Sequence, residues 1–303
     1  MAGLSLLNTC IKVVHDRIRD LHSSLTTEFA RRYLPRLDLV DQCINTNSVV
    51  YWVNGSGFQV LSELYSSISE DQYVVVGDLP YPYINESPVF FLLQVLARSL
   101  ARNGYVVLTD SVSINLGSRN VLLLGYPHTG KSTITALAVS RGFKVYSTEN
   151  TVVKVENGGL EIVAGTRVLV YDPRIRDLFR VRVESTSRTK HGYEVLDLEL
   201  LNSDLKYPAV VDEVYLIYTS FNSRGFSGQP VKGRKVDKTI WYFATSLLKG
   251  LDYYSPRPLD TPIDEPVLRT LKQLLALFRE KYNDKFHEVF GSPIEVFEGL
   301  IKS

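Results

Sequence analysis

The residues with the clearest chemical role lie between Gly125 and Ser132, in the run GYPHTGKS, which fits the pattern G-x-x-x-x-G-K-[ST] at every required position. In such a loop the glycines let backbone N–H groups point inward at phosphate oxygens, the lysine reaches the β- and γ-phosphates, and the final hydroxyl ligates Mg²⁺. Lys131 and Ser132 would take these last two roles. The sequence therefore predicts a loop that binds ATP with Mg²⁺.

The segments on either side of the loop support this prediction. The apolar run 121–124 predicts a strand directly before the loop, and residues 132–140 predict a helix directly after it. The amino end of that helix would add a partial positive charge to the site. His128 is expected to face solvent. The predicted nucleotide-binding residues are Gly125, His128, Thr129, Gly130, Lys131, Ser132 and Thr133.

A site of this kind also needs a carboxylate near Mg²⁺, at the end of a neighbouring strand. Four aspartates follow apolar runs and are candidates: Asp78, Asp110, Asp172 and Asp212. Aspartate is also common in turns, where its side chain bonds to nearby backbone. Because all four aspartates follow an apolar run, this position does not show which of them would bind Mg²⁺.

Residues 105–155 resemble the C-terminal kinase domain of HPr kinase/phosphorylase and its serine-kinase relatives. As in that family, two strands precede the loop, the following helix ends in Arg141-Gly142, and a further strand leads to the position of a paired Asp-Asp. A looser similarity extends over residues 88–250. The resemblance implies an α/β fold: a P-loop kinase domain, with a mixed β-sheet around a central helix, follows a smaller α+β N-terminal domain.

Two positions depart from the family pattern. The Asp-Asp pair, which supplies a base for the acceptor hydroxyl and a Mg²⁺ ligand, falls on Thr148 and Glu149, and a family histidine near the phosphates falls on Asp110. We expect Asp110 and Glu149 to face each other across the γ-phosphate and to share these tasks, as catalytic residues together with Lys131. Ser132 and Glu149 would be the metal ligands.

The resemblance implies an ATP-dependent kinase for a serine-like hydroxyl. The altered acidic pair slightly favours a free small molecule, such as an amino acid or a polyol, over a protein serine. Because Thr148 cannot act as a base, a nucleotide-binding regulatory protein with a degenerate catalytic site is an alternative. Another is a P-loop ATPase that uses Asp212 as its metal ligand, which predicts Asp212 beside Ser132. Members of the family form hexamers, so the resemblance also raises a homo-oligomer as an expectation.

Four basic residues are candidates for contacts with substrate phosphates. Arg174 and Arg176 lie near the place of a family arginine that faces the phosphates. Lys232 and Arg234 lie in the glycine-bearing segment 220–236, which predicts a long loop able to close over a substrate. Exposed surface charge is the alternative interpretation of both pairs.

The composition limits the partners of the chain. There are 34 basic and 33 acidic residues, which give a formal net charge of +1, so no global field attracts nucleic acid. No apolar run approaches the ~20 residues that span a bilayer, and the N-terminus does not resemble a signal peptide. We therefore expect a cytoplasmic protein that binds neither nucleic acid nor a membrane, in which Cys10 and Cys43 are reduced thiols.

The remaining patterns arrange these residues in two predicted domains: an α+β domain over residues 1–103, and the P-loop domain with C-terminal helices over residues 104–303. Apolar residues at spacings of three and four predict a first helix over residues 4–32. Further predicted helices span residues 90–102, 238–251, 267–282 and 294–301. Predicted strands include residues 48–53, 58–61, 73–76 and 214–218, and a hairpin that joins 180–184 to 193–200.

Overall fold

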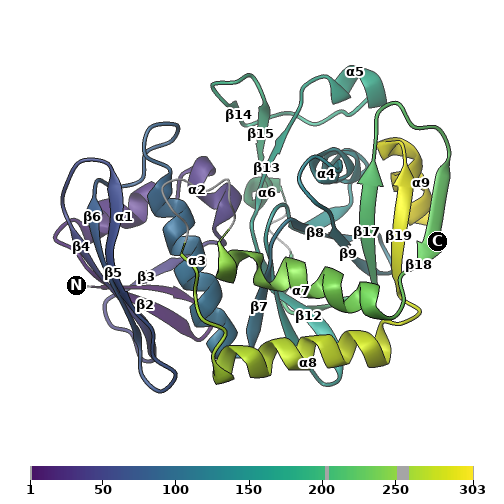
Figure 1. Cartoon of the computed structure of the whole chain (residues 1–303). Coiled ribbons are helices and arrows are strands. Elements are labelled where there is room, and N and C mark those ends of the chain that lie inside the picture. Colours follow the sequence, from purple (N-terminus) through teal and green to yellow (C-terminus); the bar gives the residue numbers. More distant parts are fainter. Residues whose placement is uncertain (1, 202–204, 251–258, 303) are drawn as a thin grey trace. The chain divides into compact units, whose positions relative to one another are not determined.

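The computed structural model describes residues 2–201, 205–250 and 259–302 (Figure 1). Within these ranges the chain has a mixed α/β structure with nine helices and several β-sheets. It divides into two compact units. Residues 1–107 and 244–273 form unit 1, and residues 108–243 and 274–303 form unit 2.

Unit 1 is built on one mixed β-sheet. Its strands are β1 (Ala2–Leu6), β2 (Thr9–Val14), β3 (Asp38–Val40), β4 (Thr46–Val53), β5 (Phe58–Leu64) and β6 (Asp71–Gly77). They are ordered β3-β1-β2-β4-β6-β5, and the pairs β2-β4 and β4-β6 are parallel. The helices α1 (Ile18–Leu25), α2 (Glu28–Tyr33) and α3 (Ser87–Arg102) complete this part of the unit.

The helix α3 is buried over nearly its whole length. The side-chain amide of Gln94 donates to the carbonyl of Leu247 at 2.7 Å, and the guanidinium of Arg98 donates to the carboxylate of Asp264 at 2.7 Å. Both acceptors belong to the later stretch 244–273. These bonds fix that stretch to α3, whereas the predicted boundary near residue 103 places it with the P-loop domain.

The helix predicted over residues 4–32 is wrong in its first half. Leu4 and Ile11 lie opposite each other in the antiparallel pair β1 and β2, because the chain reverses at the turn Leu7-Asn8. Two short strands joined by a turn place apolar residues at spacings of three and four, which is also the pattern of an amphipathic helix. Helical structure begins only at α1.

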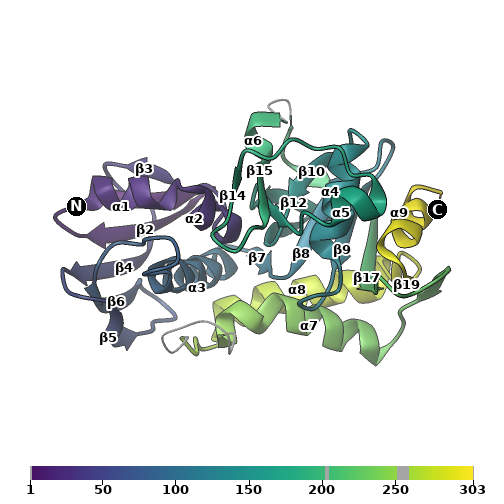
Figure 2. The same ribbon diagram turned by 90° about the horizontal axis from the view of Figure 1, so that it is seen from above.

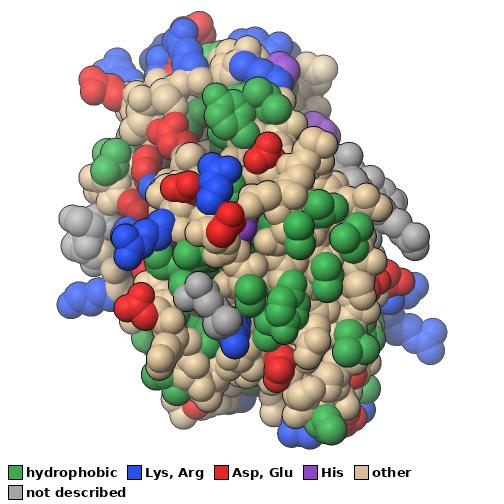
Figure 3. Space-filling view, turned by 90° about the vertical axis from the view of Figure 1, so that its left-hand side faces the viewer, with side chains coloured by type: hydrophobic (Ala, Val, Ile, Leu, Met, Phe, Trp, Pro, Cys, Tyr) green, Lys and Arg blue, Asp and Glu red, His purple; other side chains and the backbone are tan. Residues whose placement is uncertain are grey.

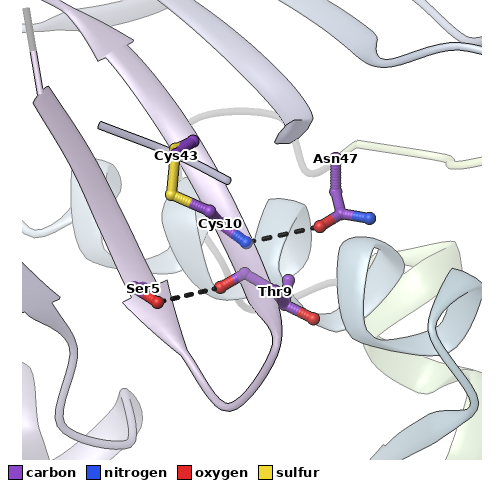
Figure 4. Close-up of a disulfide and its surroundings, with 5 residues drawn as sticks. All are labelled: Ser5, Thr9, Cys10, Cys43 and Asn47. Atoms are coloured by element: carbon purple, nitrogen blue, oxygen red, sulfur yellow. Dashed lines mark hydrogen bonds between the residues drawn. A yellow bond between two sulfur atoms is a disulfide. The ribbon is translucent and has the colours of Figure 1, made fainter. Parts of the chain in front are cut away.

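The prediction of two reduced thiols is also wrong, because Cys10 of β2 forms a disulfide with Cys43 (Figure 4). The two residues are 33 positions apart in sequence and meet because β1 pairs with β2 on one side and with β3 on the other. A Cβ atom on Gly3 would lie 2.5 Å from each sulfur atom, so only glycine leaves room for the bond. The number and spacing of the cysteines could not predict this bond, because the bond depends on the order of the strands in the sheet.

The strand β4 of unit 1 has one solvated face. Tyr51 and Val53 of β4 are exposed, and they alternate with Val50 and Trp52, which are buried. The space-filling view of this side of the molecule shows several hydrophobic side chains among charged ones (Figure 3). β4 therefore has the burial pattern of a strand with one covered and one solvated face.

Unit 2 contains a second six-stranded sheet. Its strands are β8 (Ser111–Asn115), β9 (Asn120–Leu124), β10 (Lys144–Ser147), β17 (Glu213–Thr219), β18 (Phe226–Pro230) and β19 (Phe286–Gly291). The order is β10-β8-β9-β17-β19-β18, and β17 is parallel to both β9 and β19. The helices α4 (Lys131–Ser140) and α9 (Pro293–Lys302) share a buried core with this sheet.

Two smaller groups of strands complete unit 2. The first contains β11 (Thr151–Glu156), β12 (Gly159–Gly165) and β16 (Ala209–Val210), and the second contains β13 (Val168–Tyr171), β14 (Ser187–Arg188) and β15 (Glu194–Asp197). Two short helices, α5 (Ile175–Phe179) and α6 (Leu198–Leu201), adjoin the second group.

Three elements carry the chain between the units: β7 (Tyr105–Leu108), α7 (Arg234–Lys249) and α8 (Glu265–Lys281). α7 and α8 lie side by side (Figures 1 and 2), and Arg279 of α8 donates to Asp237 of α7 at 2.7 Å. The predicted end of the first of these helices, at Leu251, lies outside the described residues. No helix in the described part of the chain is long and apolar enough to cross a bilayer.

The predicted elements around the candidate loop are confirmed. Strand 121–124 lies within β9, helix 132–140 within α4, and the buried strand 214–218 within β17. The predicted hairpin is displaced, because its first strand is β14 and not residues 180–184. Segment 220–236 is not one long loop, since β18 and the start of α7 lie in it.

Candidate functional site

The loop 125–132 joins β9 to α4 and has the backbone shape that its glycines allow. Gly130 has a φ of 91°, a left-handed conformation that other residues rarely adopt. A Cβ atom on Gly130 would lie 1.9 Å from Oγ1 of Thr219, and one on Gly125 would lie 2.4 Å from Oγ1 of Thr129. Both glycines of the motif are therefore required by close contacts, and Gly130 also by its conformation.

The start of α4 leaves backbone donors for a ligand. α4 begins at Lys131 with no side-chain cap, and the amide of Ile134 donates to the carbonyl of Gly130 at 3.0 Å. The amides before Ile134 in the first turn have no acceptor within the helix. Such amides, with the positive end of the helix dipole behind them, suit an anion.

The side chain of Lys131 is buried and forms three hydrogen bonds. Its Nζ donates to Oδ1 of Asp110 at 2.9 Å, to the carbonyl of Gly125 at 2.6 Å and to the carbonyl of Tyr126 at 3.1 Å. Asp110 is only 2% exposed, and its second oxygen, Oδ2, has no hydrogen-bond partner among the described residues. Because an unsatisfied buried oxygen is costly, this atom marks a place where a ligand or an ion would be stabilising.

Glu149 lies in the turn between β10 and β11, and its backbone is bonded at the same end of the sheet. Its carbonyl accepts from the amide of Ser111 at 2.9 Å, and its own amide donates to Oγ1 of Thr166 at 3.0 Å. Ser111 directly follows Asp110, and Glu149 is half-buried. The structure thus brings Asp110, Glu149 and Lys131 to the end of the sheet at which the loop begins.

Thr148 has a structural role. It is buried, and its hydroxyl donates to the carbonyl of Val168 at 2.9 Å. A hydroxyl held in this way cannot act as a base. Of Thr148 and Glu149, only Glu149 carries a carboxylate.

Beneath the acids lies a chain of buried hydroxyl groups that was not predicted from the sequence. Ser113 contacts Ser147 at 2.6 Å, Ser147 contacts Thr151 at 2.6 Å, and Ser111 donates to Thr151 at 2.7 Å. These bonds connect β8, β10 and β11 just below Asp110 and Glu149. In the sequence, these residues could have been found as serines and threonines at the ends of strands that are otherwise apolar.

The other residues of the predicted nucleotide site lie on the loop and on the first turn of α4. His128 is exposed, as expected, and has a left-handed φ of 66°. The hydroxyl of Thr129 donates to the carbonyl of Tyr126 at 2.8 Å. Ser132 is half-buried and Thr133 is buried. Ser132 is thus the hydroxyl of this turn that a ligand can reach.

The arginines Arg174 and Arg176 lie at α5 and have carboxylate partners. Arg174 is exposed and donates to Asp172 at 2.9 Å, and Arg176 donates to Glu194 at 3.3 Å. These contacts connect α5 with β13 and β15. Arg176 also donates to the carbonyl of Val183 at 3.0 Å, so the contacts that the structure shows for the two arginines are with residues close to α5.

Lys232 and Arg234 lie away from the loop. Lys232 pairs with Asp284 at 3.6 Å, and the neighbouring Val231 donates its amide to the carbonyl of Phe286, the first residue of β19. β19 runs parallel to β17, which runs parallel to β9, so this position is at the amino end of the strands. The loop 125–132 follows the carboxyl end of β9, at the opposite edge of the sheet.

Asp212 is likewise at the wrong end of the sheet for a metal ligand. Its Oδ2 accepts from the amide of Asn120, the first residue of β9, at 2.7 Å. The prediction that Asp212 lies beside Ser132 is therefore wrong. At the carboxyl end of β17 the structure has Thr219, whose hydroxyl donates to the carbonyl of Thr129 at 2.7 Å.

The residues at this edge can contribute to a Mg²⁺ site. No group of three or more His, Cys, Asp or Glu side chains that could hold a metal is found among the described residues. Mg²⁺, however, usually keeps several waters and takes one or two carboxylates together with phosphate oxygens. Ser132, Glu149 and the unsatisfied oxygen of Asp110 fit that requirement, whereas they do not form a metal site of protein groups alone.

Comparison with family models and with curated proteins adds no relative. No family model matches the chain, and no curated protein matches its sequence. The resemblance to HPr kinase/phosphorylase therefore stays a prediction from the residues.

Proposed function

We propose that this chain binds ATP with Mg²⁺ at residues 125–132 and transfers the γ-phosphoryl group to a hydroxyl-bearing substrate. The observation that carries the proposal is the buried pair of Lys131 and Asp110 at the base of a loop whose amides can hold an anion. A phosphate-binding lysine and a carboxylate with a free oxygen are two groups that this reaction needs near the γ-phosphate. The mixed sheet beside α4 supports a kinase domain of the P-loop type.

In the proposed step the acceptor oxygen attacks the γ-phosphorus, and the bond from that phosphorus to the oxygen of the leaving ADP breaks. The hydroxyl proton passes to one carboxylate, Asp110 or Glu149, and the other would hold the metal together with Ser132. Mg²⁺, when bound, neutralises charge on the phosphate oxygens. Lys131 must leave Asp110 and the loop carbonyls to reach the phosphates, and this movement frees Asp110 for the substrate proton.

The acceptor that we propose is a free hydroxylated metabolite, such as an amino acid or a polyol. The resemblance to serine kinases supports a serine-like hydroxyl, and the loss of one acid at Thr148 argues against the usual protein substrate.

We retain the cytoplasm as the proposed location. A disulfide such as Cys10–Cys43 is rare in that compartment except in hyperthermophiles.

Titration calorimetry with a non-hydrolysable ATP analogue and Mg²⁺, followed by a screen of ADP release with hydroxyl compounds, tests this function. We expect binding by the wild type, and ADP release that an acceptor stimulates. Asp110→Asn and Glu149→Gln should each slow transfer at least about tenfold, because positioned acids and bases contribute ~10²–10⁴. Asp237→Asn, which changes an acid of α7 paired with Arg279, is the matched control. If neither site variant slowed transfer, the assignment of roles would be wrong.

The buried hydroxyl of Thr148 supports a second candidate function, a regulatory protein that binds the nucleotide without transferring phosphate. The same experiment separates the two candidates. Tight binding of the analogue with no ADP release for any acceptor would favour the regulatory protein.

A further inference from the structure

A flat aromatic pair lies at the same edge of the sheet as the loop. Phe290 of β19 is stacked on Tyr218 of β17, with ring centroids 5.0 Å apart and an angle of 8° between the planes. Phe290 is 40% exposed and Tyr218 is half-buried. The exposed part of the Phe290 ring can therefore receive a ligand.

The register of the sheet places this pair beside the end of β9. Leu124, the last residue of β9, lies opposite Leu216, so Tyr218 and Phe290 lie beyond it in the direction of the loop. Tyr126 of the loop is 6.4 Å from Tyr218, ring centroid to ring centroid. β19 is two strands from β9, or about 9.6 Å at the usual spacing of ~4.8 Å.

The position of Lys131 sets the direction in which a nucleotide would extend. Asp110, the acid that we propose beside the γ-phosphate, lies directly before β8 and within reach of Lys131, so the γ-phosphate belongs on the β8 side of the loop. The sugar and the base then extend toward β17 and β19, over the carboxyl ends of the parallel strands, where ligands bind in open α/β sheets. We propose that the nucleobase stacks on the exposed ring of Phe290, which Tyr218 supports from behind. This proposal rests on the proposed nucleotide function of the loop.

A second exposed aromatic ring at this edge is an alternative. Phe221, in the segment that follows β17, is 55% exposed and stacks on Phe179 of α5 at 5.6 Å. That pair joins the segment to α5 and has no aromatic contact with the loop among the described residues. Tyr218, in contrast, is in aromatic contact with Tyr126 of the loop itself. We therefore assign the base to Phe290.

The test is titration calorimetry of the full chain with ATP and with inorganic tripolyphosphate, both in Mg²⁺. We expect Phe290→Leu to weaken ATP binding about tenfold, since a base stacked on an aromatic ring depends on the flat ring surface. Tripolyphosphate, which has no base, should bind the variant as well as it binds the wild type. Phe290→Tyr should restore ATP affinity. Tyr193→Leu, which removes a ring of similar exposure directly before β15, is the matched control.

Each outcome separates the base site from the function of the loop. Unchanged ATP affinity in Phe290→Leu, or an equal loss for both ligands, would overturn the base site, whereas binding of both ligands by the wild type would still support phosphate binding by the loop. A loss of ATP affinity in Phe221→Leu without one in Phe290→Leu would also overturn it. A wild-type chain that bound neither ATP nor tripolyphosphate would overturn the base site and the proposed function together.

Discussion

Lys131 and Asp110 form an ion pair in which both side chains are less than a tenth exposed. Removing one partner leaves an uncompensated buried charge, which costs about 3–5 kcal/mol. We expect Lys131→Met to lower the free energy of unfolding by about that amount, and the double variant Lys131→Met/Asp110→Asn to regain a large part of it. Urea unfolding of the wild type, both single variants and the double variant measures the coupling. If the loss of stability in the double variant equalled the sum of the losses in the two single variants, Lys131 and Asp110 would not be energetically coupled.

The lowered pKa of Glu194 in β15 predicts how the free energy of unfolding changes with pH. Burial by itself raises the pKa of this carboxyl, but hydrogen bonds from Ser185 and Arg188 and the charge of Arg176 hold its pKa below the usual value. A lowered folded-state pKa gives a stabilisation that is complete above the unfolded pKa and is lost as pH falls through the folded pKa. Glu194→Gln should therefore be less stable than the wild type at pH 7, and the difference should shrink between about pH 5 and pH 3. Urea midpoints measured across this range test the prediction, and a constant difference would contradict it.

At the scale of elements, the turn from β9 into α4 depends on the space at Gly130. Gly130→Ala introduces a side chain at a φ of 91° and 1.9 Å from the hydroxyl of Thr219. We expect a loss of about 1–3 kcal/mol in stability and loss of nucleotide binding. Adding Thr219→Ala should restore part of the stability, because it removes the contact but not the strain. Gly142→Ala, at a φ of 79° with open space around it, is the control for strain alone. Equal effects at the two glycines would show that the contact with Thr219 is unimportant.

The same turn shows how far the sequence predicts elements. β9, the loop and α4 follow one another along the chain, so local patterns were sufficient to predict them. The bond between Lys131 and Asp110 joins residues 21 positions apart and depends on the pairing of β8 with β9, which local patterns do not contain. β19 was missed for a related reason. It is a strand because it pairs with β17 and β18, which come from distant parts of the chain.

At the scale of the whole molecule, the sequence predicted one domain boundary near residue 103. A single boundary cannot describe unit 1, which is built from two separate stretches of the chain. Unit 1 includes residues 244–273 because polar side chains of α3 bond to them. Arg98 is completely buried between Asp71 and Asp264, and only the fold brings these three residues together. Contacts of this kind lie between 27 and 166 positions apart in sequence, far beyond the range of helix and strand patterns.

The disulfide of unit 1 gives a prediction for the whole chain. In the chain-entropy account, a bond between residues 33 positions apart stabilises the fold by about 4 kcal/mol. We expect a reducing agent to lower the urea midpoint of the wild type and to leave that of the double variant Cys10→Ser/Cys43→Ser unchanged. The reduced wild type and the variant should then unfold at similar urea concentrations. Nucleotide binding in native buffer should be the same in all three samples, because the loop 125–132 belongs to unit 2. A wild-type midpoint that does not respond to reduction would contradict this stabilisation by the disulfide.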